Sequence, residues 1–171
     1  EALALGLHLL GDGDGVLDLV TAGSAGVGTQ QGYATIRLGR GDGTFGSALS
    51  YQTETGVSGR SYAVSLGDLN GDGILDLVTA GSAFSGIAQG YATIRLGRGD
   101  GTFVNALAYQ TETGAGSGSR ALSLGDLNGD GILDLVTAGY VQPSGTNVYA
   151  TIRLGRGDGT FGSAISYLTE T

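Results

Sequence analysis

The stretch SLGDLNGDGILDLVTAG, residues 65–81, recurs without a change at residues 123–139. A shortened relative of it, GDGDGVLDLVTAG, occupies residues 11–23. The aspartate that closes each copy stands at Asp18, Asp76 and Asp134, so the interval is 58 residues both times (76 − 18 and 134 − 76). The chain of 171 residues is therefore just under three copies of one unit, and a repeat of this kind governs the whole fold.

Within one unit the pattern predicts four short strands and no helix. In the second unit these are residues 61–69, 75–81, 91–97 and 102–112, separated by glycine-rich segments that would break any helix. We expect an all-β fold of three tandem four-stranded antiparallel blades, of the β-propeller kind. The predicted units are residues 1–59, 60–117 and 118–171, which together form one repeat domain.

The segment DLNGDGILD, residues 68–76, has oxygen-bearing side chains at positions 1, 3, 5 and 9 and a glycine at position 6. Ca²⁺ is a hard cation that takes six to eight oxygen ligands, and this spacing supplies them from one tight loop. The absence of a glutamate at position 12 and of flanking helices argues against an EF-hand. The predicted ligands are Asp68, Asn70, Asp72, the carbonyl of Ile74 and Asp76, and in the third unit Asp126, Asn128, Asp130, the carbonyl of Ile132 and Asp134.

The first unit carries a degenerate loop. Asp12, Asp14, Val16 and Asp18 match positions 3, 5, 7 and 9, but position 1 falls on Leu10. Aligning residues 2–6 with residues 121–125 instead implies a small insertion and still supplies no acid at position 1. We therefore expect two good calcium sites and a third, weaker one.

Composition limits the function classes. The net charge is −8, with no Lys, and nine of the sixteen acidic residues lie in the three loops, so a nucleic-acid partner is not expected. No segment is apolar for the ~20 residues that a membrane span needs. With no Cys and a single histidine, His8, the chain offers no catalytic set, and we expect no enzyme.

Taken together, GDLNGDGILDLV and LGRGDGTFGSA resemble the FG-GAP/VCBS repeat family, which includes the calcium-binding blades of integrin α-subunit propellers. The Phe-Gly signature is echoed at residues 45–48 and 161–164 and is eroded at residues 103–106. The resemblance implies a four-stranded blade with Ca²⁺ in the first hairpin loop, in an extracellular or cell-surface protein that binds ligands or has a structural role.

The constant blocks are separated by three variable windows of nine residues, 24–32, 82–90 and 140–148. An up-and-down blade places the calcium loop and the RGDG turn at one edge, and the variable windows at the opposite edge. In the resembling family, the opposite edge carries partner-binding loops. A lectin-like or adhesive module that binds glycan or protein through these windows is therefore one hypothesis for the function.

The other hypothesis is a structural one, and it follows from the number of units. Propellers close with about four to eight blades, so three blades leave open edges that must be covered. Two chains that complete a ring of about six blades, self-association end to end, or continuation into a longer array would each cover them, and we rank the last two above the closed dimer. Calcium would rigidify each blade. We rank this structural hypothesis first.

The tripeptide Arg-Gly-Asp occurs at residues 40–42, 98–100 and 156–158. It stands each time where the third strand must reverse into the fourth, and Asp-Gly favours a tight turn. We interpret it as a turn and not as an integrin ligand.

Overall fold

The computed structural model of the chain describes residues 2–8, 14–26, 30–53, 58–84, 86–111, 116–141 and 147–170. It contains twelve strands in three separate four-stranded sheets, and each pairing is antiparallel between strands consecutive in the chain. The first sheet consists of β1 (Ala2–His8), β2 (Asp18–Ala25), β3 (Gln31–Arg37) and β4 (Leu49–Gln52). The second consists of β5 (Ser58–Gly67), β6 (Asp76–Phe84), β7 (Ala88–Arg95) and β8 (Leu107–Gln110), and the third of β9 (Gly118–Gly125), β10 (Asp134–Val141), β11 (Asn147–Arg153) and β12 (Ile165–Glu170).

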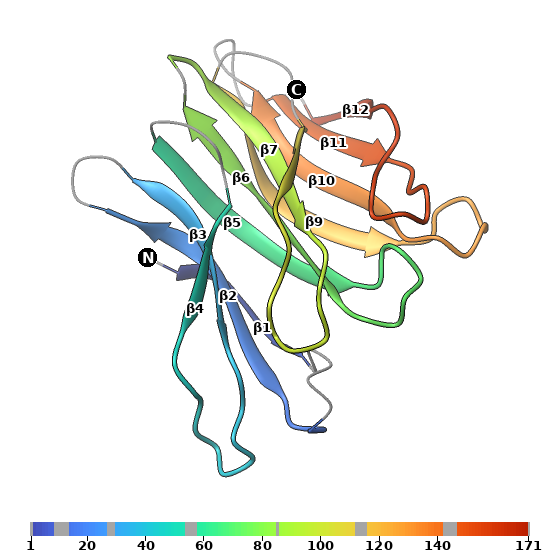
Figure 1. Cartoon of the computed structure of the whole chain (residues 1–171). Helices are drawn as coiled ribbons and strands as arrows, with labels where there is room; N and C mark the ends of the chain where they lie inside the picture. The colour runs from blue at the N-terminus through green and yellow to red at the C-terminus, as the bar shows by residue number, and fades with distance from the viewer. Residues whose placement is uncertain are drawn as a thin grey trace.

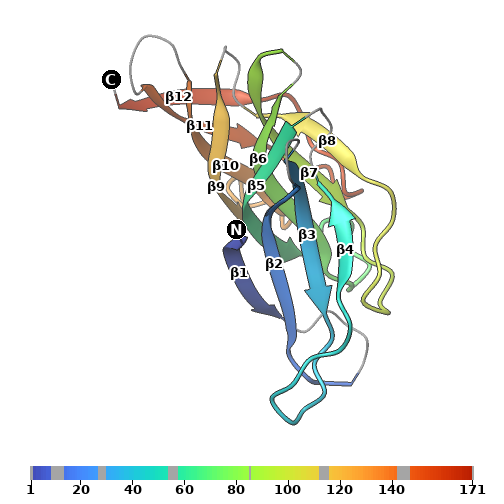
Figure 2. The ribbon, with the colours of Figure 1, turned by 90° about the vertical axis from the view of Figure 1, so that its left-hand side faces the viewer.

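The all-β prediction with four strands per unit is confirmed, and the described residues contain no helix. None of the three sheets closes on itself. They follow one another across the molecule in chain order, blue, green and orange-red in Figure 1, and Figure 2 shows the same succession from the side. Among the described residues, no helix is long and apolar enough to cross a membrane.

Consecutive sheets pack face to face. Strand β5 lies against β1, β2 and β3, and β9 lies in the same way against β5, β6 and β7. We call the face of a sheet that meets the preceding repeat its leading face, represented in the second sheet by Leu77, Arg95 and Phe103. The face that meets the following repeat is its trailing face, represented in the first sheet by Val20, Ile36 and Tyr51.

The core is therefore two layers of side chains, one between each pair of sheets. The first layer is made by Val20, Ala34, Ile36, Leu77 and Phe103. The second is made by Leu69, Val78, Ala92, Ile94, Leu135 and Phe161. The alternation of strands explains this, because every second residue of β7, such as Ala92 and Ile94, points to the trailing side and its neighbours to the leading side.

Two strand predictions need correction. The second and third strands of each unit run into the variable window, where Ser82, Ala83 and Phe84 pair with Gly90, Gln89 and Ala88. The windows are hairpin ends and not loops throughout; residues 27–29, 85 and 142–146 of them lie outside the described residues. The fourth strand of the second unit was expected over residues 102–112, but β8 covers only Leu107–Gln110.

The register also settles the two alignments of the first loop. His8 pairs with Asp18 as Gly67 pairs with Asp76 and Gly125 with Asp134. Nine residues separate His8 from Asp18, against eight between Gly67 and Asp76. The loop of the first unit is thus one residue longer, so it contains the small insertion. The ungapped alignment is off by one residue, and the alignment of residues 2–6 with residues 121–125 is off by two.

Candidate metal centre

Each predicted calcium loop joins the first and second strands of its sheet and is shaped by its own side chains. In the second unit, both carboxylate oxygens of Asp68 accept backbone N–H groups, from Gly71 at 2.7 Å and from Gly73 at 2.9 Å. Asp72 Oδ1 accepts the N–H of Ile74 at 2.8 Å. Gly71 and Gly73 have φ of 76° and 81°, the left-handed region that glycine adopts without strain.

The loop of the third unit repeats this geometry. Asp126 accepts N–H groups from Gly129 at 2.7 Å and Gly131 at 2.9 Å, and Asn128 Nδ2 donates to Asp130 at 2.9 Å, as Asn70 Nδ2 does to Asp72. The identical sequences thus give the same loop conformation twice, although only the second loop lies under a following repeat among the described residues. The conformation is therefore local, set by the loop itself.

These hydrogen bonds keep the first aspartate of each loop charged. The N–H groups of Gly131 and Gly129 hold the pKa of Asp126 below its usual value. Burial of Asp68 works against ionisation, but the N–H groups of Gly73 and Gly71 outweigh it and lower the pKa of Asp68 as well. Both loops therefore present a carboxylate that stays ionised at neutral pH.

Asp76, the predicted ninth-position ligand, is fully buried at the start of β6. Its two oxygens accept the N–H of Leu69 at 2.8 Å and the N–H of Gly97 at 2.8 Å. Burial raises its pKa, and the charges of Asp72 and Asp68 raise it further. Asp76 thus joins the beginning of the loop to the end of the third strand, and its carboxylate is repelled by those of Asp72 and Asp68.

The same bond recurs in the other units, from Gly39 to Asp18 at 2.9 Å and from Gly155 to Asp134 at 2.8 Å. The sequence reasoning missed this role of the closing aspartate. The sequence held no specific signal for it, because the interval of 21 residues between this aspartate and the first glycine of LGRGDG is constant only in the way that all intervals within the repeat are.

The first loop is described only from Asp14 onward, and the predicted ligand Asp12 lies outside the described residues. The described half resembles the other loops. Asp14 Oδ1 accepts the N–H of Val16 at 2.7 Å, and Gly15 has φ of 73°.

The oxygen-bearing side chains of the second loop fit the ligand preference of calcium. Among the described residues, no three His, Cys, Asp or Glu side chains converge on one point. The loop brings together Asp68, Asn70 and Asp72, while Asp76 is directed to Leu69 and Gly97. All of these are oxygen donors, and amide, carbonyl and water oxygens complete the shell of Ca²⁺ in proteins, so the set fits calcium and does not fit a metal that prefers nitrogen or sulfur.

The RGDG turns lie beside these loops. Asp158 Oδ1 accepts the N–H and the hydroxyl of Thr160, at 2.9 Å and 2.6 Å, and the hydroxyl of Thr160 lowers the pKa of Asp158. The N–H of Gly159 donates to the carbonyl of Leu69, in the calcium loop of the preceding unit, at 3.1 Å. A cavity of about 470 Å³ separates Asp68 and Gly71 of that loop from Arg156 and Gly157. The turn prediction is confirmed, and this turn also contacts the preceding repeat.

The sequence that carries these loops and turns matches the model of a known repeat. The model of the FG-GAP-like repeat matches residues 12–79 and 83–137, which together are most of the chain. The chain belongs to the FG-GAP-like repeat family. Both matched stretches contain a predicted calcium loop, and the first FG-GAP-like match begins at the degenerate one. A comparison with curated proteins found no match.

Proposed function

We propose that this chain is a non-enzymatic, calcium-binding structural module whose FG-GAP-like repeats are rigidified by Ca²⁺ and associate end to end. Its sheets are the blades of a propeller-like array. The observation that carries the proposal is the pair of identical loops, in which an ionised aspartate, an amide and a second aspartate are held in place by backbone N–H groups.

Charge supports a cation in these loops. None of Asp68, Asp72, Asp126 and Asp130 forms an ion pair with an arginine of the described residues. Two or three carboxylates within nine residues repel one another unless a cation lies between them. The residues that would hold Ca²⁺ are Asp68, Asn70, Asp72 and the carbonyl of Ile74 in the second unit, with Asp126, Asn128, Asp130 and the carbonyl of Ile132 in the third. Asp76 and Asp134 would close the sites.

The packing of the Ile74 and Ile132 side chains supports the proposal that the backbone carbonyls of these two residues bind Ca²⁺. Ile74 Cγ2 stands 2.8 Å from the place that a Cβ on Gly97 would take, and Ile132 Cγ2 stands 2.7 Å from the same place on Gly155. These side chains pack on the third-strand end and hold the loop backbone at position 7 in a fixed place. A bound Ca²⁺ would then supply charge neutralisation and join the loop to the strand that follows it.

The proposed location is extracellular or at the cell surface. Calcium sites of moderate affinity fill at the millimolar Ca²⁺ concentrations found outside cells. A recognition role for the variable windows stays a prediction.

Thermal unfolding with and without calcium tests the proposal. A site held at ~100-fold over its dissociation constant adds about 2.7 kcal/mol, so two sites add about 5 kcal/mol. For a chain of this size we expect the melting temperature to fall by about 10 °C or more in EDTA.

Two double variants make the same change, aspartate to asparagine, either in the calcium loops or in the RGDG turns. Asp72→Asn with Asp130→Asn keeps an acceptor for the N–H of Ile74 and Ile132 but removes the loop charge, and it should lose the response to calcium. Asp42→Asn with Asp100→Asn changes exposed turn aspartates instead, and it should keep the response. A melting temperature that is the same in calcium and in EDTA for the unmodified chain would contradict the proposal.

A further inference from the structure

The contact between consecutive repeats occurs twice in the chain, with the same residues one period apart. Tyr51 meets Phe103 edge to face at 5.7 Å between ring centroids, and Tyr109 meets Phe161 at 5.9 Å. The Tyr51 hydroxyl accepts the N–H of Phe103 at 3.2 Å, and that of Tyr109 accepts the N–H of Phe161 at 3.1 Å. A tyrosine of the trailing face thus always meets a phenylalanine of the next leading face.

An arginine adds a second link. Arg95 Nη2 donates to the carbonyl of Gln52 at 2.8 Å, and its guanidinium carbon lies 5.2 Å from the centre of the Tyr51 ring. Arg153 repeats both contacts with Gln110, at 2.7 Å, and with the Tyr109 ring, at 5.1 Å. Each arginine thus combines a charged hydrogen bond with a cation–π contact across the interface.

Leucines packed against glycines complete the fit. Leu38 Cδ2 of the first repeat lies 2.8 Å from the place that a Cβ on Gly101 would take, and Leu96 Cδ2 lies 2.5 Å from that place on Gly159. In the opposite sense, Leu133 Cδ1 of the third repeat lies 2.8 Å from that place on Gly67. A methyl group at any of these glycines would force the facing leucine side chain to shift, and at Gly101 and Gly159 it would also be strained by φ of 77° and 79°.

The trailing face of the third sheet presents the same residues without a partner repeat among the described residues. Tyr167, the equivalent of Tyr51 and Tyr109, is 55% exposed, and Leu154, the equivalent of Leu38 and Leu96, is 38% exposed. Leu127 is 54% exposed, whereas its equivalent Leu69, under the third repeat, is 3% exposed. At Gly125, the equivalent of Gly67, no atom of the described residues lies within 4 Å of an added Cβ.

The leading face of the first sheet has the complementary features. Leu17, the equivalent of Leu133, is 51% exposed, and no atom of the described residues lies within 4 Å of a Cβ placed on Gly43, the equivalent of Gly101. A cavity of about 300 Å³ there is lined by Leu17, Gly43 and Phe45. In the second sheet, Leu38 and Tyr51 of the first repeat fill the equivalent place. In the third sheet, Leu96 and Tyr109 of the second repeat fill it.

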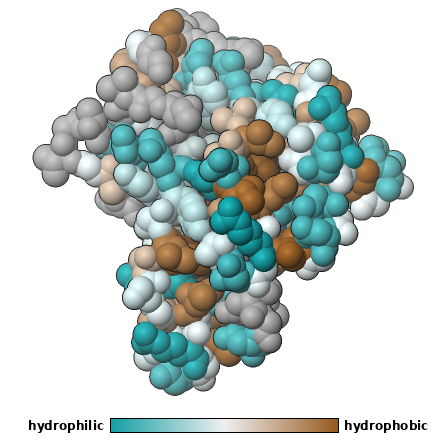
Figure 3. Space-filling model, viewed as in Figure 1, coloured by the Kyte–Doolittle hydropathy of each residue, from teal (hydrophilic) through white to brown (hydrophobic). Residues whose placement is uncertain are grey.

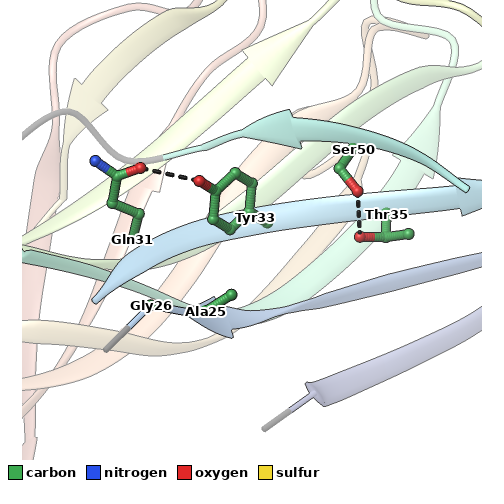
Figure 4. Close-up of a pocket in the computed structure, with 6 residues that line it drawn as sticks. All are labelled: Ala25, Gly26, Gln31, Tyr33, Thr35 and Ser50. Atoms are coloured by element: carbon green, nitrogen blue, oxygen red, sulfur yellow. Dashed lines mark hydrogen bonds between the residues drawn. The ribbon is translucent and has the colours of Figure 1, made fainter. Parts of the chain in front are cut away.

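A second cavity, of about 460 Å³, lies on the same leading face and is shown in Figure 4. It is lined by Tyr33, whose hydroxyl donates to Gln31 at 2.9 Å, and by Thr35, which is hydrogen-bonded to Ser50 at 3.1 Å. The equivalent of Thr35 in the second sheet, Thr93, is buried and donates to the carbonyl of Thr53 in the preceding repeat at 2.6 Å. Both cavities therefore stand where a preceding repeat packs in the other two sheets.

We infer that the trailing face of the third sheet binds the leading face of the first sheet of a second copy of this chain, in the register of the internal interfaces. Tyr167 would meet Phe45 and Arg37, Leu154 would pack on Gly43, and Leu17 would pack on Gly125. The contact is head to tail, so its two halves are different surfaces and it is not two-fold symmetric. The inference specifies the end-to-end association of the proposed function.

Complementary half-blocked chains test this contact. Gly125→Val with Tyr167→Ala blocks only the trailing face, and Leu17→Asp blocks only the leading face; all three residues lie at exposed or open positions. In sedimentation velocity we expect the unmodified chain to form species larger than a dimer. Each half-blocked chain should be monomeric, with a dissociation constant raised about tenfold or more, and a mixture of the two should form a one-to-one dimer.

Two controls keep the result interpretable. Ala106→Val, at an exposed position of the middle unit, should associate as the unmodified chain does. Gly125→Ala alone, which adds one methyl group in open space, should fold with an unchanged melting temperature and still weaken association. An unmodified chain that stays monomeric at high concentration, or half-blocked chains that do not combine, would overturn the inference.

Repeating the mixing experiment in calcium and in EDTA separates this inference from the proposed function. If the chain binds no calcium and the dimers form equally in calcium and in EDTA, the calcium proposal is refuted and the head-to-tail contact still stands. A chain that binds calcium but never combines would do the reverse.

Discussion

At the residue scale, the glycine that directly precedes each RGDG turn has a steric role and a hydrogen-bonding role. A Cβ on Gly155 would stand 2.3 Å from the carbonyl oxygen of Leu133, a backbone atom that cannot move aside. Its N–H donates to the buried carboxylate of Asp134. The two contacts fix the end of the third strand against the end of the calcium loop.

Gly155→Ala should therefore destabilise the chain by about 2 kcal/mol or more, because the methyl group must displace the Leu133 carbonyl and disturb the bond to Asp134. Gly162→Ala is the control, since its Cβ would lie 3.5 Å from the carbonyl oxygen of Leu154, an ordinary contact. That change should stay within about 0.5 kcal/mol. Urea unfolding of the two variants measures both, and equal midpoints would show that the close approach is unimportant.

The sequence predicted which residues share a loop but not which way each carboxylate points. Asp68 and Asp72 lie in one tight loop, as expected, because the glycines at positions 4 and 6 adopt the left-handed backbone conformation that such a loop needs. The bond of Asp76 to Gly97 joins residues 21 apart, and no local pattern encodes it. Whether Asp76 also binds metal remains a prediction.

At the element scale, the repeat predicted four strands per unit. The predicted strand ends were wrong where side-chain hydrogen bonds or backbone pairing override the local sequence pattern. The second and third strands extend into the variable windows because ladder hydrogen bonds need only backbone, which no side-chain pattern reveals. The fourth strand of the second unit, β8, begins late because Arg95 Nη1 donates a hydrogen bond to the carbonyl of Val104 at 2.9 Å. That carbonyl then has a guanidinium partner instead of a neighbouring strand.

The tyrosines of the fourth strands allow a matched comparison between a covered and an uncovered face. Tyr109→Phe removes the acceptor for the Phe161 N–H and should lower the free energy of unfolding by about 1 kcal/mol. Tyr167→Phe makes the same change on the open face and should have no effect at concentrations where the chain is monomeric. Equal losses in denaturant unfolding would mean that the hydroxyl does not act across the repeat interface.

At the scale of the whole molecule, the chain consists of sheets whose opposite faces differ and fit one another. The sequence predicted open ends, because three units are too few for a ring, but it could not say which residues face the next unit. That depends on the packing of sheets far apart in sequence. The space-filling view shows apolar side chains at the surface among polar ones on one face of the molecule (Figure 3). Leu17, Leu127 and Tyr167, on whichever face they lie, are about half exposed, at 51%, 54% and 55%.

The central claim is that the two complete loops bind calcium, and titration of the metal-free chain with Ca²⁺ by calorimetry tests it most directly. We expect two sites per chain, with Asp72→Asn removing one, Asp130→Asn removing the other, and Asp14→Asn affecting only a weaker third event. No binding up to about 10 mM Ca²⁺, beyond the weakest class of protein calcium sites, or two sites that survive both substitutions, would contradict the account.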